Sequence, residues 1–163
     1  MPRQSKFKGK ETEGIKKLYN AALYIRLSVE DGDKEESNSI TNQRLLLTEF
    51  LKENSDIELY DYYIDDGFSG TDFSRPGFER LLEDLYSKKF NTVIVKDLSR
   101  LGRNYIEVGN YIEKVFPLFN IRFIAINDQI DSIKNPESIN SVIVPFKNLI
   151  NDEYCRDISN KVK

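Results

Sequence analysis

The order of hydrophobic and polar residues along this chain predicts strands that alternate with helices. Short apolar runs that suit buried strands lie at 21–27, 57–64, 92–95 and 121–126. Helical spacing of apolar residues occurs at 39–54, around 78–85, at 104–117, in a short stretch from 138, and from 146 to the end. Alternating strands and helices with short connections form a mostly parallel sheet that is covered on both faces. We therefore predict a three-layer α/β/α fold with a sheet of four to five strands.

The two ends of the chain differ from this central part. Residues 1–20 are polar and rich in lysine, with little periodicity, and are predicted to form a flexible leader. Residues 21–145 form the predicted domain, and residues 146–163 begin a long helix. The last residues keep a helical pattern without a glycine or proline that would stop it. We therefore expect the chain to continue in a longer protein.

Composition narrows the class of protein. A length of 163 residues predicts one domain, and a hydrophobic share of 39% is too high for a disordered chain. The single cysteine, Cys155, excludes an internal disulfide framework, and we expect its side chain to be buried or half-buried. No apolar run reaches the ~20 residues of a membrane helix, and the polar N-terminus is not a signal peptide. These features favour a cytoplasmic protein without a membrane partner.

The absence of histidine excludes more chemistry than any other feature of the composition. The chain has no histidine, so Ser-His-Asp and Cys-His catalysis and histidine-ligated zinc are excluded. Catalysis must then depend on serine, tyrosine, lysine, arginine, aspartate or glutamate. A net charge of −3 argues against a protein that coats nucleic acid by bulk attraction, but it leaves room for a local basic site.

Candidate chemistry gathers where the predicted strands end. Open parallel sheets bind ligands beyond the carboxyl ends of their strands, and the residues expected at this edge are Ser28, Asp66, Arg100 and Arg103. Guanidinium groups pair with phosphate oxygens through two parallel hydrogen bonds. The two arginines also precede a helix that Asn104 is predicted to cap, and helix N-termini favour anions. The pattern predicts a phosphate-binding edge, with solvated surface charge as the alternative.

Two polar residues interrupt apolar segments near this edge. Arg26 lies inside the apolar run of the first predicted strand, where an unpaired buried charge is costly. It either pairs with a structural carboxylate or lies beneath an anionic substrate. Gln43 shares a helical stripe with apolar residues, so it either satisfies a buried backbone group or extends into the site.

The remaining candidates also have two or more interpretations. Ser28 either closes a turn after the first strand or acts as a nucleophile whose developing charge is stabilised by nearby arginines. Asp66, with its neighbour Asp65, is a metal ligand, a general acid or base, or an ion-pair partner that holds arginines. Arg75 either contacts phosphate or only precedes a helix.

Five short motifs in this order make the chain resemble the serine recombinases of the resolvase/invertase superfamily. The similarity is greatest to the large, transposon-encoded members of mobile elements, and it extends from about Ala21 to the C-terminus. The motifs are Tyr24–Ser28 (YIRLS), Ser39–Gln43 (SITNQ), Asp66–Gly70 (DGFSG), Arg75–Phe78 (RPGF) and Ser99–Asn104 (SRLGRN).

The resemblance implies a site-specific DNA recombinase with Ser28 as its nucleophile. The serine would attack a DNA phosphate, form a phosphoserine bond to the 5′ end and release a 3′ hydroxyl, without a metal or cofactor. Arg26, Arg100 and Arg103 would bind the phosphate and stabilise its transition state. The residues expected to complete the site are Gln43, Asp66 and Arg75.

The resemblance also implies partners for this protein, and the sequence departs from the family pattern at one position. Family members act on double-stranded DNA as homodimers that join into a synaptic homotetramer, and residues 146–163 would begin their interface helix. Their DNA-binding domains lie outside this chain, so we expect little recombination from it alone. Small resolvases carry aspartate where this chain has Ser99, and Asp97, two residues earlier, is not expected to replace it because of strand alternation.

Two alternatives of other classes remain open from the sequence. One is a magnesium-dependent phosphatase or nuclease that uses Asp65, Asp66 and Asp97 at strand ends. The other is a phosphate-sensing interaction module without enzymatic activity.

Overall fold

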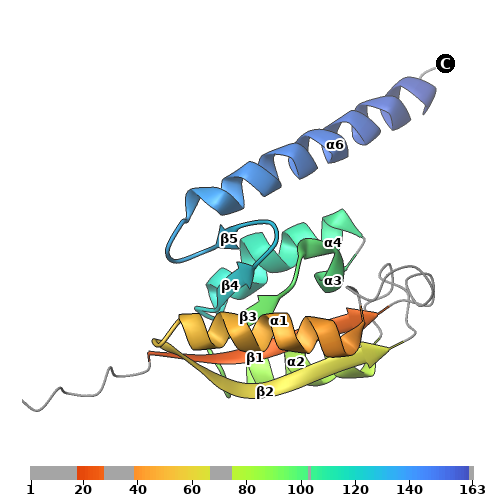
Figure 1. Ribbon diagram of the computed structural model, residues 1–163. Coiled ribbons are helices and arrows are strands. Elements are labelled where there is room, and N and C mark those ends of the chain that lie inside the picture. Colours follow the sequence, from red (N-terminus) through yellow and green to blue (C-terminus); the bar gives the residue numbers. More distant parts are fainter. Residues whose placement is uncertain (1–17, 28–38, 67–74, 103, 162–163) are drawn as a thin grey trace, which may run out of the picture.

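The computed structural model describes residues 18–27, 39–66, 75–102 and 104–161, which form a sheet between two layers of helices (Figure 1). The sheet has the strand order β2-β1-β3-β4-β5. Its strands are β1 (Tyr19–Leu27), β2 (Ile57–Asp66), β3 (Thr92–Val95), β4 (Arg122–Ala125) and β5 (Ile130–Asp131). The first four are parallel to their neighbours and β5 is antiparallel to β4, so the predicted fold class is confirmed.

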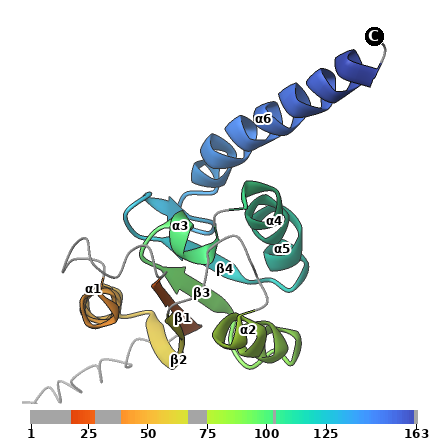
Figure 2. The ribbon, with the colours of Figure 1, turned by 90° about the vertical axis from the view of Figure 1, so that its right-hand side faces the viewer.

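Helices cover both faces of this sheet, as Figure 2 shows when it is viewed from one end. The helical elements are α1 (Ile40–Glu53), α2 (Pro76–Tyr86), α3 (Leu98–Leu101), α4 (Tyr105–Asn110), the π-helical turn η3 (Tyr111–Val115), α5 (Phe116–Leu118) and α6 (Glu137–Lys161). On one face, Leu47 of α1 packs against alternate residues of the strands, such as Leu23, Ile25 and Ile94. On the other face, α2 and the α4–α5 segment cover a second apolar cluster that includes Tyr24 and Val93.

Most element boundaries follow from local sequence signals. Ser39 accepts a hydrogen bond from the backbone N–H of Asn42 and caps α1, as its position predicted. Asn104 accepts from the N–H groups of Ile106 and Glu107 and begins α4. β1 starts at Tyr19, so the last two residues of the predicted leader belong to the sheet, while residues 1–17 lie outside the described part of the chain.

Several other elements differ from the sequence prediction. The helical segment after Asn104 continues one residue past Pro117, to Leu118, where the sequence predicted an end at the proline. α3 and β5 were not predicted, since elements of four and two residues are too short to show periodicity. One helix, α6, replaces the two predicted helices that were to begin at 138 and 146.

Helix α6 projects beyond the body of the domain (Figure 1). Its first half packs on the α4–η3 segment, where Ile143 joins the apolar cluster of that face. Cys155 lies in the projecting half and is exposed, so the expected burial of this side chain is wrong. Within the described ranges, none of the helices combines the length and apolar character that crossing a bilayer requires.

A buried ion pair joins the β4–β5 edge to the start of the sheet. Arg122 is 2% exposed, and its Nε and Nη2 donate to the two carboxylate oxygens of Asp131 at 3.0 and 2.7 Å. Its Nη1 lies 3.6 Å from the carboxylate of Asp56, and its guanidinium covers the ring of Tyr19. Burial acts to raise the pKa of Asp131, but hydrogen bonds from Arg122 and two backbone N–H groups outweigh it, so this pKa lies below its ordinary value.

Replacing Asp131 with asparagine is expected to lower the free energy of unfolding at pH 7 by about 3 kcal/mol, because it removes the nearer counter-charge of a buried guanidinium and leaves only the more distant Asp56 carboxylate. The pKa of Asp131 is lower in the folded than in the unfolded state, so the carboxylate stabilises the fold above about pH 4. That stabilisation is lost as pH falls through the lowered pKa. Urea unfolding of both proteins from pH 7 to pH 3 should therefore show the difference shrinking in acid.

The matched control is Asp61→Asn, which removes a carboxylate that pairs with Arg80 at 2.9 Å on the surface. Both side chains of that pair are about half exposed, and we expect a change below about 1 kcal/mol. Equal effects of the two substitutions would contradict the importance of the buried pair.

Candidate functional site

Arg26 and Arg100 hold the end of β1 against α3 through hydrogen bonds in both directions. The Arg26 side chain donates from Nε to the carbonyl of Arg100 at 3.2 Å and from Nη2 to that of Ser99 at 2.6 Å. In return, Nη1 of Arg100 donates to the carbonyl of Arg26 at 3.1 Å. The two side chains are 0% and 5% exposed. Arg26 is thus a charge bonded to backbone carbonyls beneath α3, while its own backbone receives Arg100.

Gln43 supports the same backbone group from the opposite face of the sheet. Its amide Nε2 donates to the carbonyl of Arg26 at 3.1 Å, and the side chain is fully buried on α1. The carbonyl of Arg26 therefore accepts hydrogen bonds from both Gln43 and Arg100. Of the two interpretations of Gln43, the observed contact is the one with a buried backbone group. That group, the carbonyl of Arg26, lies two residues before Ser28.

Arg75 approaches this cluster from the start of α2. It is 1% exposed, and its Nη2 donates to the carbonyl of Leu101 in α3 at 2.9 Å. Its guanidinium carbon lies 5.6 Å from the ring centre of Tyr24 and 5.1 Å from that of Phe78. Arg75 therefore joins α2 to α3 beside two aromatic rings, and three buried guanidinium groups gather around one short helix.

Asp65 fixes the N-terminus of α2. For this residue and its neighbour Asp66, the sequence had suggested a metal ligand, a general acid or base, or an ion-pair partner. The carboxylate of Asp65 accepts from the backbone N–H groups of Gly77 and Phe78 at 2.8 and 2.9 Å and from the hydroxyl of Tyr24 at 2.9 Å. Burial and the neighbouring Asp65 carboxylate raise the pKa of Tyr24 above its ordinary value, although Arg75 acts in the other direction. Tyr24 consequently keeps its proton and donates a hydrogen bond to Asp65.

Asp66 lies one residue further along β2, where the sheet register pairs it with Leu27 of β1. It is exposed, in contrast to the buried Asp65. Leu27 directly precedes Ser28, so the exposed carboxylate stands beside the strand end from which the candidate nucleophile continues. Ser28 and Arg103 themselves lie outside the described residues.

The carboxylate of Asp97 lies next to Ser99 at the start of α3. The hydroxyl of Ser99 donates to Oδ1 of Asp97, and the Nε of Arg100 lies 3.7 Å from Oδ2 of the same carboxylate. Strand alternation does not separate the two side chains, because residues two positions apart lie on the same face of a strand and β3 has already ended at Val95. Asp97 is already the N-cap position of α3, and a helical turn brings residue 99 back toward it.

The described residues give no support to a magnesium site. Among them, no cluster of three potential ligands from aspartate, glutamate, cysteine or histidine occurs. Of the three aspartates in that hypothesis, Asp65 already accepts three hydrogen bonds. Asp97 accepts one from Ser99 and lies beside a guanidinium group.

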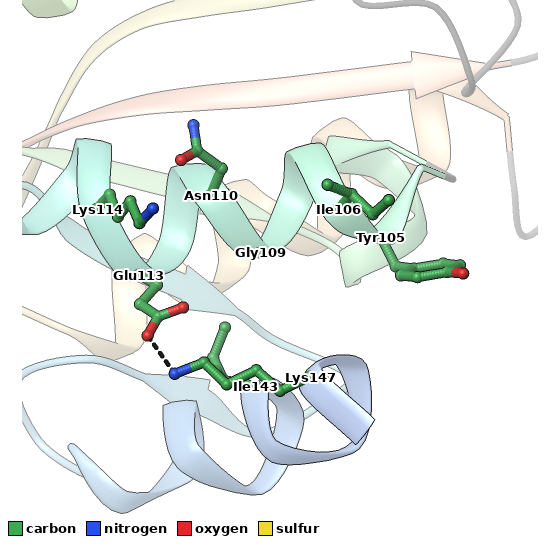
Figure 3. Close-up of a pocket in the computed structure, with 8 residues that line it drawn as sticks. All are labelled: Tyr105, Ile106, Gly109, Asn110, Glu113, Lys114, Ile143 and Lys147. Atoms are coloured by element: carbon green, nitrogen blue, oxygen red, sulfur yellow. Dashed lines mark ion pairs between the residues drawn. The ribbon is translucent and has the colours of Figure 1, made fainter. Parts of the chain in front are cut away.

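A hollow of about 240 Å³ lies away from this cluster, between α6 and the α4–η3 segment (Figure 3). Glu113 of η3 and Lys147 of α6 form an ion pair of 2.6 Å beside it. None of the predicted site residues lines this hollow, which is bounded by Tyr105, Ile106, Gly109, Asn110, Glu113, Lys114, Ile143 and Lys147. The candidate site is therefore defined by the guanidinium cluster at the strand ends.

Sequence reasoning missed the part that Tyr24 and Asp128 have in building this cluster. Tyr24 stands two positions before Arg26, and the period of two in a strand could have placed both on one face. Asp128, in the turn between β4 and β5, accepts from the N–H of Leu98 at 2.7 Å and caps α3. No sequence signal identifies this long-range cap. The contact of Asp97 with Arg100 was also not predictable, because it depends on α3, which the sequence did not predict.

Comparison with known proteins relates this chain to DNA recombination enzymes. Residues 21–163 match the family model described as "Resolvase, N terminal domain". The N-terminal catalytic domain of TP901-1 integrase is 29% identical, with a TM-score of 0.69 over 85% of this chain and 98% of that one. A resolvase family site-specific recombinase from Streptococcus pneumoniae shares the fold at 24% identity and a TM-score of 0.68, over 88% and 96% of the two chains. No curated protein sequence matches the chain.

Gly77→Ala is expected to destabilise the fold by about 1 to 3 kcal/mol, because a β-carbon there would lie 2.7 Å from the carbonyl oxygen of Ile64 and 2.9 Å from the Asp65 carboxylate. Thermal or urea unfolding measures the change. The matched control is Gly109→Ala in α4, where a β-carbon meets no atom within 4 Å. We expect that variant to be as stable as the parent or up to about 1 kcal/mol more stable, and a loss at Gly109 equal to that at Gly77 would contradict the steric argument.

Proposed function

Because this chain belongs to the resolvase family and is a site-specific recombinase catalytic domain, we propose that Ser28 cleaves DNA by attacking the scissile phosphate. The observation that carries the proposal is the cluster of three buried guanidinium groups around α3, adjoining the strand end that leads into Ser28. Such a cluster offers fixed positive charge for the phosphate and for the negative charge that develops during its transfer.

The proposed reaction exchanges one phosphate ester for another. The oxygen of Ser28 forms a bond to phosphorus as its proton leaves, and the bond to the 3′ oxygen of the DNA breaks. That oxygen takes up a proton, and the 5′ phosphate remains bonded to the serine. Attack by a 3′ hydroxyl on the phosphoserine reverses these steps and rejoins the strand. The ester energy is conserved, so the reaction needs no nucleotide cofactor, and in this proposal the guanidinium groups take the part of a metal in stabilising charge.

The described contacts support a distinct role for each arginine. Arg100 has its Nη1 on the carbonyl two residues before Ser28, so we assign it to the phosphate and its transition state. Arg26, fully buried against α3, contributes fixed charge and holds Arg100 in place, together with Gln43. Arg75 contributes charge from α2, while Arg103 and Asp66 complete the proposed set.

We further propose the partners of this reaction. Family membership implies DNA binding and oligomerisation in general. The specific proposal is a homodimer that pairs into a synaptic homotetramer on double-stranded DNA in the cytoplasm, with α6 contributing to the interface. We also propose that the 163-residue chain alone binds DNA weakly and recombines little, since its net charge of −3 gives little general attraction to phosphate.

Ser28→Ala is expected to abolish a covalent protein–DNA adduct, because no other group would carry the phosphate. The full-length product of the gene is incubated with a pool of duplexes of varied sequence that carry nicks, which trap the cleaved strand. Denaturing gels detect the adduct, and mass spectrometry locates the linked residue and the 5′ phosphate. Addition of a chelator should leave the adduct unchanged.

The matched control is Ser87→Ala, which alters an exposed serine at the end of α2. It should form the adduct at the parental rate. An adduct that persists in Ser28→Ala would refute the assignment of the nucleophile, and one that disappears with chelator would favour the metal-dependent alternative.

Arg100→Ala is expected to lower the cleavage rate by about 100-fold or more, the scale of losing one charged group that stabilises a transition state. The variant should remain folded, because Arg26 still bonds the backbone carbonyls of residues 99 and 100. Single-turnover cleavage and circular dichroism measure the two effects. The control is Arg80→Ala, an arginine that is about half exposed on α2. An unfolded Arg100→Ala protein would instead assign Arg100 a structural role.

A further inference from the structure

We propose that Asp97 is a positioning residue for DNA cleavage, which acts by setting the orientation of the Arg100 guanidinium. The proposal rests on the function proposed above and adds a residue to that site. Its basis is the contact of one carboxylate with both neighbouring groups of the motif: Oδ1 accepts from the hydroxyl of Ser99, and Oδ2 lies 3.7 Å from the Nε of Arg100.

The start of α3 shows why the carboxylate faces these groups. Asp97 occupies the N-cap position, where an aspartate side chain ordinarily accepts from the helix's first N–H groups. It makes no such bond here. Asp128 accepts from the N–H of Leu98 instead and supplies the cap from the β4–β5 turn. With that function taken over by Asp128, the carboxylate of Asp97 is directed toward Ser99 and Arg100.

Two contacts then define the plane of the Arg100 guanidinium. The Nη1 group donates to the carbonyl of Arg26 at 3.1 Å on the side of β1, and the Nε group faces Asp97 on the side of α3. The side chains of Arg100 and Asp97 are 7% and 21% exposed, so water screens this pair less than a surface pair. One hydrogen bond and one ion-pair contact on different edges of a planar group restrict its rotation before substrate binds, which is the preorganisation that charge stabilisation requires.

Ser99 has a defined part in this arrangement. Its hydroxyl donates to Oδ1 of Asp97 and so restricts the rotation of the carboxylate. The aspartate and the serine together place one negative charge beside Arg100. A carboxylate placed on residue 99 should then replace the one on residue 97, since the Ser99 side chain already reaches the carboxylate that faces this guanidinium.

The test compares three variants of the full-length protein: Asp97→Ala, Asp97→Asn, and the double variant Asp97→Ala with Ser99→Asp. Single-turnover cleavage of a nicked duplex that the parent cleaves is measured together with noncovalent binding of the same DNA. We expect Asp97→Ala and Asp97→Asn to cleave about 10- to 100-fold more slowly, the range for a misplaced catalytic group, with unchanged DNA binding. The double variant should recover most of the lost rate. The control, Asp61→Asn, should cleave like the parent.

The outcomes separate this inference from the proposed function. Parental cleavage by the isosteric Asp97→Asn variant would overturn the role of Asp97 and leave Ser28 as the nucleophile. A double variant as slow as Asp97→Ala would also overturn it, because a purely structural role of residue 97 predicts no recovery. Failure of the parent protein to form any adduct would overturn the proposed function together with this inference.

Discussion

The site depends on one constraint, which is that the buried guanidinium of Arg26 must find acceptors inside the domain. It finds them in the backbone carbonyls of Ser99 and Arg100, and this choice ties the end of β1 to the turn that follows β3. The carbonyl of Arg26 in turn accepts from Arg100 and Gln43, which come from opposite faces of the sheet. A single residue of β1 therefore fixes both the proposed phosphate-binding arginine and the backbone that leads into the proposed nucleophile.

Carboxylates in this domain divide between structure and the proposed chemistry according to burial. Asp65 is buried and has its oxygens committed to the N-terminus of α2 and to Tyr24, so it places Arg75 without facing solvent. Its neighbour Asp66 is exposed at the edge of the sheet beside Leu27. Strand alternation explains this division, because adjacent residues of β2 point to opposite faces. Two consecutive aspartates thus have different roles, Asp65 in holding α2 and Asp66 in the proposed chemistry.

Local signals were sufficient to predict much of this architecture. The helix cap at Ser39 and the limits of β3 appear in the structure where the sequence placed them, because each depends on contacts within a few residues. The gathering of strand ends at one edge also followed from sequence, since it depends only on the strands being parallel. Elements without local periodicity, α3 and β5 above all, were not predictable, and the two predicted C-terminal helices proved to be one.

By itself the sequence determined the fold class, the chemistry that lack of histidine excludes, and the set of residues at the carboxyl ends of the strands. The tertiary structure decided what those residues contact. Arg26 bonds carbonyls 73 and 74 positions away, and Leu98 is capped by Asp128, 30 positions away. The physical reason is that hydrogen-bond partners of buried polar groups are chosen by packing, which brings together residues that no local pattern relates.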